Sequence, residues 1–151
     1  TGQSGMSALS IERVDGSDID LRQALVSADL PTDDIEDEGR TFFRIVSDDS
    51  LTVGFAGLEA CDGDQLLRSV VVLPGLRGKG LGSAAVAAVV AHVEPRSDVF
   101  LATTNASSFF ARLGFIQVQR ENLPAAVLAT RQLSSLCPSS ATIMKLIRPP
   151  T

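Results

Sequence analysis

The chain lacks tyrosine and tryptophan altogether, and its 151 residues include only one histidine and two cysteines. No tyrosine hydroxyl can therefore donate a proton in a reaction, and the aromatic chemistry depends on seven phenylalanines and one histidine. The two cysteines, Cys61 and Cys137, argue against a disulfide framework and are typical of a reduced, cytoplasmic protein.

Long apolar runs and excess positive charge are also missing. No apolar stretch approaches the ~20 residues needed to cross a bilayer, and a net charge of −5 argues against nucleic acid as a partner. The composition of 44% hydrophobic and 21% charged residues is typical of a globular domain. The opening TGQSG before Met6 is typical of an expression remnant, and we expect no secretory signal. We therefore expect one cytoplasmic domain over residues 6–151, with no membrane contact.

Apolar periodicity predicts an α+β fold in a chain long enough to bury a two-layer core. The run LLRSVVVL predicts a central strand buried on both faces, and a later helix leads from a glycine-rich loop to Pro95. Because three antiparallel strands precede that loop, the central sheet is expected to be mixed, mostly antiparallel and flanked by helices. The expected strands are 7–14, 41–46, 51–60, 65–73, 98–102, 115–119 and 142–147, and the other expected helices are 17–28, 32–38, 105–113 and 124–133.

The stretch LPGLRGKGLGS, residues 73–83, places four glycines and two cations between the central strand and this helix. Such a turn leaves backbone N–H groups directed at one spot, with the positive end of the helix dipole behind them. Glycine also lets the backbone come close to an oxyanion. The stretch therefore predicts a phosphate site, because a turn that binds nothing needs neither four glycines nor two cations.

Two nucleotide-binding loops compete for this stretch. The Walker pattern is excluded, because Leu73 stands where its first glycine belongs and Gly80 follows Lys79. The dinucleotide pattern G-x-G-x-x-[GA] is met by Gly80, Gly82 and Ala85, but that fold places it after the first strand of a parallel unit. The acidic residue that this fold requires would be Asp98, which opens a strand instead of ending it. A dinucleotide-binding domain is the weaker alternative.

The segment RGKGLG also fits [RQ]-x-x-G-x-[GA], and ATTNASSFFARLGF follows it downstream. With the lead-in VVVLPGLRGKGLG, these segments resemble the acetyl-CoA-dependent N-acetyltransferases of the GNAT superfamily. The resemblance implies a GNAT-like fold with a β-loop-α cofactor site, acetyl-CoA as co-substrate and no metal. It also implies that the pantetheine arm pairs with the fourth strand, where a backbone N–H polarises the thioester carbonyl. The implied cofactor-binding residues are Val70, Val71 and Val72 through their main chain, then Arg77, Gly78, Lys79, Gly80, Leu81, Gly82, Asn105 and Arg112, the last alternatively a solvated surface arginine.

The chain departs from the family's pattern at Phe110. The family usually has a tyrosine here, whose hydroxyl protonates the leaving CoA thiolate, and a phenyl ring has no such proton. Cys137 is either a substitute acid or a small buried hydrophobe. Phe109 and Leu113 are expected to be core residues.

Acetylation of an amine also needs a base or a water path that takes the proton of the amine. Glu59, near the end of the third strand, and Asp64, at the start of the fourth, are the main candidates. Glu36 and Glu38, from the predicted acidic helix, are further ones. His92, at the far end of the helix that follows the glycine loop, is interpreted as structural.

Arg68 carries the only charge in the apolar core of the predicted central strand. An arginine there must meet an anion or reach the open side of the sheet. It therefore forms either an internal ion pair or a clamp for a substrate carboxylate, arsonate or phosphinate beside the thioester. The sequence leaves both interpretations open.

A narrower resemblance rests on LLRSVVVLPGLRGKGLG, FFARLGF and SSLCPSSATIM. These stretches are similar to a branch of small GNAT proteins encoded with bacterial arsenic-resistance genes. The resemblance implies a small acceptor amine, amino-acid-like or arsenic-containing, that contacts Arg68 and Ser139 or Ser140. It also raises the question of whether Cys61 and Cys137 come close enough to bind arsenic.

The resulting hypothesis is an acetyl-CoA-dependent N-acetyltransferase that acts on a small amine by direct transfer. The alternative is a CoA-binding sensor or interaction module with impaired catalysis, which Phe110 keeps open. The sequence leaves a homodimer open as well.

Overall fold

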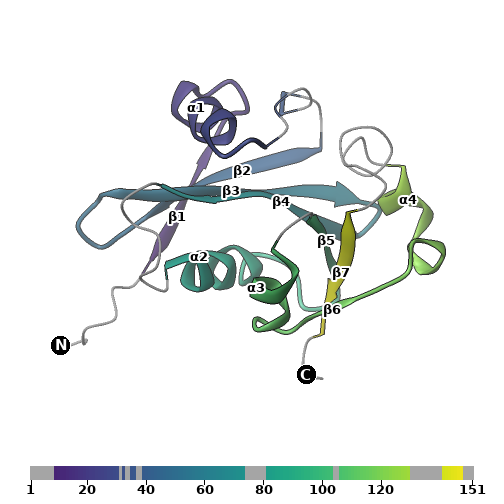
Figure 1. The fold of residues 1–151 in the computed structure, drawn as a ribbon. Helices are drawn as coiled ribbons and strands as arrows, with labels where there is room; N and C mark the ends of the chain where they lie inside the picture. Colours follow the sequence, from purple (N-terminus) through teal and green to yellow (C-terminus); the bar gives the residue numbers. More distant parts are fainter. Residues whose placement is uncertain are drawn as a thin grey trace. The chain divides into compact units, whose positions relative to one another are not determined.

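The computed structural model describes residues 9–30, 32, 35–36, 39–73, 81–103, 106–129 and 141–147 (Figure 1). The strands form one mixed sheet in the order β1-β2-β3-β4-β5-β7-β6, which confirms the expected α+β class. The strands are β1 (Ser10–Val14), β2 (Arg40–Val46), β3 (Thr52–Cys61), β4 (Asp64–Val72), β5 (Val99–Thr103), β6 (Phe115–Gln117) and β7 (Thr142–Leu146), and the helices are α1 (Ile19–Ser27), α2 (Leu81–Val90), α3 (Ser107–Ala111), the short 3-10 helix η1 (Arg120–Asn122) and α4 (Ala125–Leu128).

The chain divides into two compact units. The first consists of Thr1–Gly57 and Ser69–His92, and the second of Leu58–Arg68 and Val93–Thr151. The division falls within β3 and β4, so each of these two strands contributes to both units.

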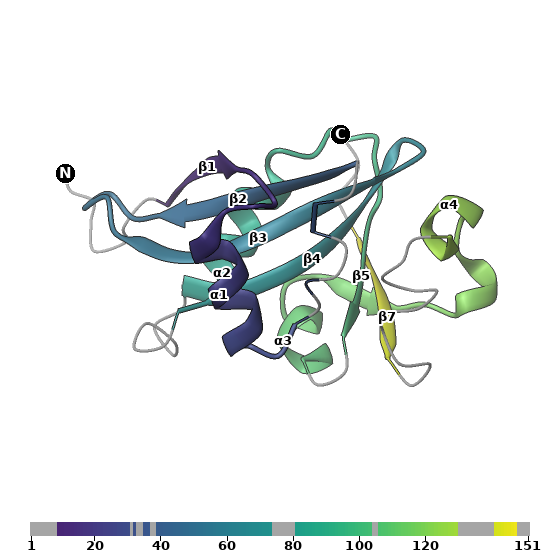
Figure 2. The same ribbon diagram turned by 90° about the horizontal axis from the view of Figure 1, so that it is seen from above.

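In the first unit, α1 and α2 lie on opposite faces of the sheet (Figures 1 and 2). Helix α1 begins where Asp18 Oδ1 accepts a hydrogen bond from Leu21 N at 3.0 Å, so Asp18 is its N-cap. Strands β1 and β2 pair antiparallel, from Ser10 opposite Val46 to Val14 opposite Phe42. The buried core on the α1 side consists of Leu21, Ala24, Leu25, Ile35, Phe42, Phe55 and Val71.

In the second unit, β4 pairs parallel with β5 at Gln65–Val99 and Leu66–Phe100. Strand β7 pairs antiparallel with both β5 and β6, so this unit contains parallel and antiparallel strand pairs. Gly114 has φ +101° after α3, a left-handed conformation in which glycine commonly ends a helix. The buried core of this unit consists of Cys61, Leu66, Phe100, Leu123, Val127 and Ile143.

Several predicted helices are too long. Helix α2 ends at Val90, not near Pro95, because His92 N bonds to Val89 O at 3.0 Å in a turn, while Val93 is buried outside the helix. Helices α3 and α4 have five and four residues. Ile35 and Glu36 lie in a turn, and most of the predicted acidic helix falls outside the described residues. No helix among the described ranges has the length and hydropathy of a membrane span.

Gly54 on β3 allows β4 to approach closely. A Cβ at this position would stand 2.0 Å from the Val71 carbonyl oxygen, which is backbone and cannot swing away. We expect Gly54→Ala to lower the free energy of unfolding by about 3 kcal/mol, measured by urea denaturation. The control is Gly63→Ala, in a turn with open space but φ +95°, with an expected loss of about 1 kcal/mol. Equal losses in the two variants would contradict the close-approach argument.

Candidate functional site

Strand β4 contains one residue more than its pairing with β3 allows. The two-residue turn that joins the strands makes Cys61 and Asp64 partners. An unbroken register would then place Val72 opposite Val53. Instead, Leu73 N donates a hydrogen bond to Val53 O at 2.8 Å, so Leu73 is the partner. Strand β4 therefore has a β-bulge along its length.

The bulge lies at Ser69. This residue has φ +58°, and no other described residue within a strand has a positive φ. Glycine is the usual residue at a positive φ. Here a serine adopts it, and this serine is only 9% exposed. After the bulge, the Val71 side chain enters the α1-side core, and those of Val70 and Val72 are half-buried. The bulge thus fixes which main-chain groups the second half of β4 presents to each side.

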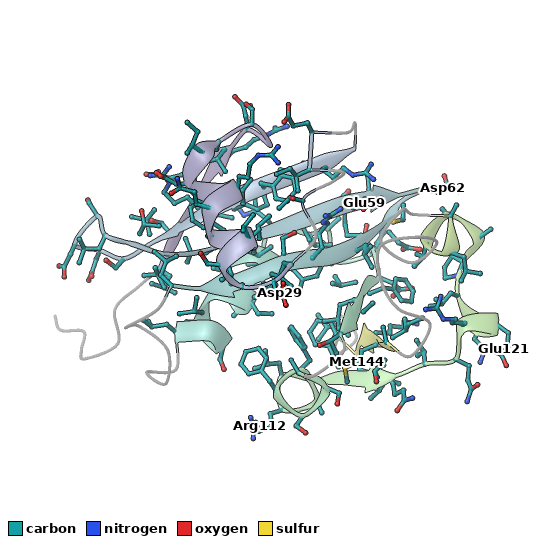
Figure 3. All side chains as sticks on the ribbon, turned by 45° about the horizontal axis from the view of Figure 1, so that its top comes forward. Asp29, Glu59, Asp62, Arg112, Glu121 and Met144 are labelled. Atoms are coloured by element: carbon teal, nitrogen blue, oxygen red, sulfur yellow. The ribbon has the colours of Figure 1, made fainter. Side chains whose placement is uncertain are left out.

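Directly before the bulge, Arg68 forms a buried ion pair with Glu59 of β3. Arg68 Nη1 lies 3.3 Å from Glu59 Oε1, and the side chains are 1% and 5% exposed. Figure 3 labels Glu59 on its strand. Of the two interpretations of Arg68, the internal ion pair is therefore present. Glu59 is not a solvated surface carboxylate, since its side chain lies in the interior.

Asp64, the second candidate base, holds a turn. Its Oδ1 accepts a hydrogen bond from Asp98 N at 2.9 Å, and Gln65 N donates to Asp98 O at 2.9 Å. These bonds align β4 with β5 at the start of their parallel pairing. The carboxylate thus has a structural task in addition to any role in proton transfer.

The predicted cofactor loop joins β4 to α2 within the first unit. Residues 74–80, which include Arg77, Gly78, Lys79 and Gly80, lie outside the described residues. Its two ends are described. Leu73 N donates its hydrogen bond to Val53 O, and α2 begins at Leu81, followed by Gly82. A ten-residue helix therefore starts directly after the glycine-rich stretch, as a phosphate site at a helix N-terminus requires.

The α3 region presents an aromatic cluster and an exposed arginine. The Phe110 ring is 8% exposed and packs edge-on against Phe109 and Phe115, with centroid distances of 5.0 and 5.6 Å. Phe109 and Leu113 are only half-buried, so the prediction of core positions for them was wrong, and Phe110 is the buried residue of α3. Arg112 is exposed at the end of α3 (Figure 3). Asn105 lies outside the described residues.

Of the remaining predicted site residues, some lie within the described ranges and others lie outside them. Cys61 is buried, and its thiol lies 3.4 Å from Glu59 O. Cys137, Ser139 and Ser140 fall outside the described residues, as does Glu38. The His92 ring packs edge-on against Phe43 at 5.5 Å, which agrees with its structural interpretation. Within the described ranges, no three His, Cys, Asp or Glu residues are grouped as metal ligands would be.

Sequence reasoning missed an open cavity of about 330 Å³ in the first unit. It lies against α1, with a floor from β3 and the second half of β4. A signal for it was present, because polar residues repeat at helical spacing along α1 beside the predicted apolar face. The described residues that line it are Asp20, Gln23, Ala24, Ser27, Thr52, Phe55, Val71 and Leu73.

Residues 38–117, more than half of the chain, match the model of the acetyltransferase (GNAT) domain family. No curated protein matches the chain in sequence. An acetyltransferase of the GNAT family from Staphylococcus aureus has a similar structure, with 17% identity, a TM-score of 0.62, and coverage of 92% of this chain and 98% of that one. A Mycobacterium tuberculosis protein crystallised with CoA has 20% identity, a TM-score of 0.68, and coverage of 92% and 99%.

N-acetylglutamate synthase from Neisseria gonorrhoeae, crystallised with CoA and L-arginine, has 20% identity and a TM-score of 0.68. The match covers 95% of this chain but 34% of the synthase chain. At these identities, the three solved structures show a shared fold.

Proposed function

We propose, since this chain belongs to the GNAT family of acetyltransferases, that it transfers the acetyl group of acetyl-CoA directly to a small amine. Family membership makes the chain an N-acetyltransferase. The observation that supports the proposal most is the glycine-rich stretch placed between the bulged strand β4 and the start of α2. The Mycobacterium tuberculosis and Neisseria gonorrhoeae structures both contain CoA, which supports an acyl-CoA co-substrate.

The proposed cofactor site uses main-chain groups. The amides of residues 77–82 hold the pyrophosphate at the positive end of the α2 dipole, and Lys79 and Arg77 add charge. The pantetheine arm pairs with the backbone of residues 70–72, directly after the Ser69 bulge. A backbone N–H there polarises the thioester carbonyl. Such a hydrogen bond stabilises the transition state most where water is excluded. Asn105 and the exposed Arg112 are the further proposed contacts.

In the proposed reaction, the amine nitrogen attacks the thioester carbon, the C–S bond breaks, and the nitrogen loses a proton. The CoA thiolate leaves and takes up a proton. Phe110 has no hydroxyl for this, so Cys137 or solvent remains the proposed acid. Glu59 and Asp64 remain the proposed bases, although each carboxylate also holds structural contacts.

The finer identity of the acceptor is supported by sequence resemblance alone. An amino-acid-like or arsenic-containing amine, with Arg68, Ser139 and Ser140 as contacts, fits the narrower resemblance. Arg68 is 1% exposed at its side chain, so contact with an acceptor requires its pair with Glu59 to open.

The test is thiol release from acetyl-CoA against a panel of monoamines, diamines, amino acids and amine-bearing arsenicals, with the acetylated product identified by mass spectrometry. We expect turnover on at least one amine, with one thiol released per amide formed. Tight acetyl-CoA binding without turnover on any amine would favour the alternative, a CoA-binding module with impaired catalysis, for which Phe110 is the supporting observation. Preference for NAD over CoA would contradict both.

A further inference from the structure

The cavity beside α1 combines an apolar interior with a polar rim. Ala24, Phe55, Val71 and Leu73 supply the apolar part. The polar lining consists of Asp20, Gln23, Ser27 and Thr52, so its described lining includes a single charged residue, and this residue is acidic. A cavity of about 330 Å³ lies at the lower end of the range typical of small-ligand sites.

The position of the cavity relates it to the proposed chemistry. Val71 and Leu73 belong to the segment of β4 that follows the Ser69 bulge. The proposed function places the thioester along the backbone of this same segment. An amine bound at the β4 end of the cavity would therefore be close to the thioester carbon. A second group of the same molecule would extend over Phe55 toward α1.

Among the described lining residues, Asp20 places a negative charge at the α1 end of the cavity. The Asp20 side chain is 70% exposed, and its nearest described cation is Arg44, whose Nη2 lies 3.8 Å from Asp20 Oδ2. Arg44 lies closer to Asp18, at 3.5 Å, and its guanidinium stands 5.9 Å from the centre of the Phe55 ring. Arg44 itself does not line the cavity. Asp20 thus keeps room to accept a charge-assisted hydrogen bond from a ligand cation.

We propose that this cavity binds the acceptor and that the acceptor is a cationic amine, in which a second ammonium group binds Asp20 and an apolar segment separates it from the nucleophilic nitrogen. The placement of the reacting end rests on the proposed function, whereas the cavity and its charge do not. Separation of the two nitrogens suits the chemistry, because a carboxylate beside the nucleophile would stabilise its unreactive ammonium form. The same carboxylate disfavours acceptors that carry a carboxylate or arsonate, so this proposal and the acceptor implied by the narrower resemblance are alternatives.

The experiment compares 1,4-diaminobutane, butylamine and glutamate as acceptors in the full chain. The first two differ only by the second amine, so their ratio reports the group that Asp20 is proposed to bind. We expect kcat/KM to be at least about tenfold higher for the diamine than for butylamine, and glutamate to be the poorest of the three. Asp20→Asn should lower kcat/KM for the diamine by about tenfold or more by raising the KM for the diamine. It should leave kcat/KM for butylamine and the KM for acetyl-CoA unchanged.

The matched control is Asp29→Asn, which makes the same chemical change just after the end of α1 (Figure 3). Asp29 is exposed, has φ +62°, which asparagine tolerates, and does not line the cavity. It should leave all three acceptors unchanged. Turnover that favours glutamate or butylamine, or an equal effect of Asp20→Asn on both amines, would overturn the proposal while leaving acetyl transfer itself established.

If no amine is acetylated, the proposed function fails, and binding still tests the cavity. Isothermal titration of the CoA-loaded protein with 1,4-diaminobutane should then show binding that Asp20→Asn weakens about tenfold and Asp29→Asn does not. The absence of diamine binding would overturn the proposal.

Discussion

Replacement of Arg68 by methionine should lower the free energy of unfolding by about 3–5 kcal/mol. The Arg68 guanidinium lies 3.3 Å from the Glu59 carboxylate, and both side chains are at least nine-tenths buried. Its removal takes away the cation that lies 3.3 Å from a buried carboxylate, so part of the attraction that offsets the desolvation of that charge is lost. Urea denaturation measures the loss as a lower midpoint with an unchanged slope.

A matched control separates burial from proximity. Arg22 and Glu36 form a shorter ion pair, at 2.8 Å, with side chains 43% and 61% exposed. Arg22→Met makes the same substitution there, and we expect it to cost less than about 1 kcal/mol, because water screens the pair. Similar losses in Arg68→Met and Arg22→Met would contradict the argument from burial.

The double variant decides between the two interpretations of Arg68. Substitution of both Arg68 and Glu59 by methionine removes the two charges together, and packed apolar groups often replace a buried ion pair at little net cost. We expect it to recover most of the stability lost in Arg68→Met. If Arg68 acts only through the ion pair, the double variant should have the same KM for the acceptor as the wild-type protein. A raised KM in a fully stable double variant would instead show that Arg68 contacts the acceptor.

The sequence allowed much of the fold to be predicted, because apolar alternation and turn residues act locally. The hairpin around Asp62 and the stop at Gly114 follow from residue types with one strong backbone preference. Helix ends were predicted less well. Pro95 is a clear stop signal, but α2 already ends at Val90. Val93 is buried although it lies outside the helix, so its apolar spacing made the predicted helix too long.

The bulge at Ser69 could not be predicted, because its signal is absent from the sequence. A left-handed residue in a strand is usually glycine, and a serine in the run LLRSVVVL gives no such indication. Arg68 did indicate a buried charge, but apolar periodicity alone does not say which acidic residue is its partner, Glu59. The cavity was missed although polar residues repeat along α1, because its shape depends on how α1 packs on β3 and β4.

Replacement of Gly80 by glutamate should raise the Kd for CoA by about a hundredfold or more while the protein stays folded. The proposed function places the CoA pyrophosphate against the amides of this loop, where a carboxylate would repel it by about 4 kcal/mol at 4 Å in a protein-surface dielectric. The added side chain would also take the space that glycine leaves for close approach of the phosphate. Isothermal titration with CoA measures the affinity, and thermal unfolding without ligand measures the fold.

The control variant adds the same charge to a different part of the same structure. Ala87 is exposed on α2, beyond its first turn, and glutamate is a good helix former there. Ala87→Glu should therefore bind CoA within about threefold of the wild-type protein, because one more charge at that distance is largely screened. A Gly80→Glu protein that binds CoA as well as Ala87→Glu does would show that the pyrophosphate lies elsewhere. Loss of CoA binding in Gly80→Glu alone would instead locate the anion at the glycine-rich loop, and hence locate the thioester on the bulged half of β4 that the loop follows.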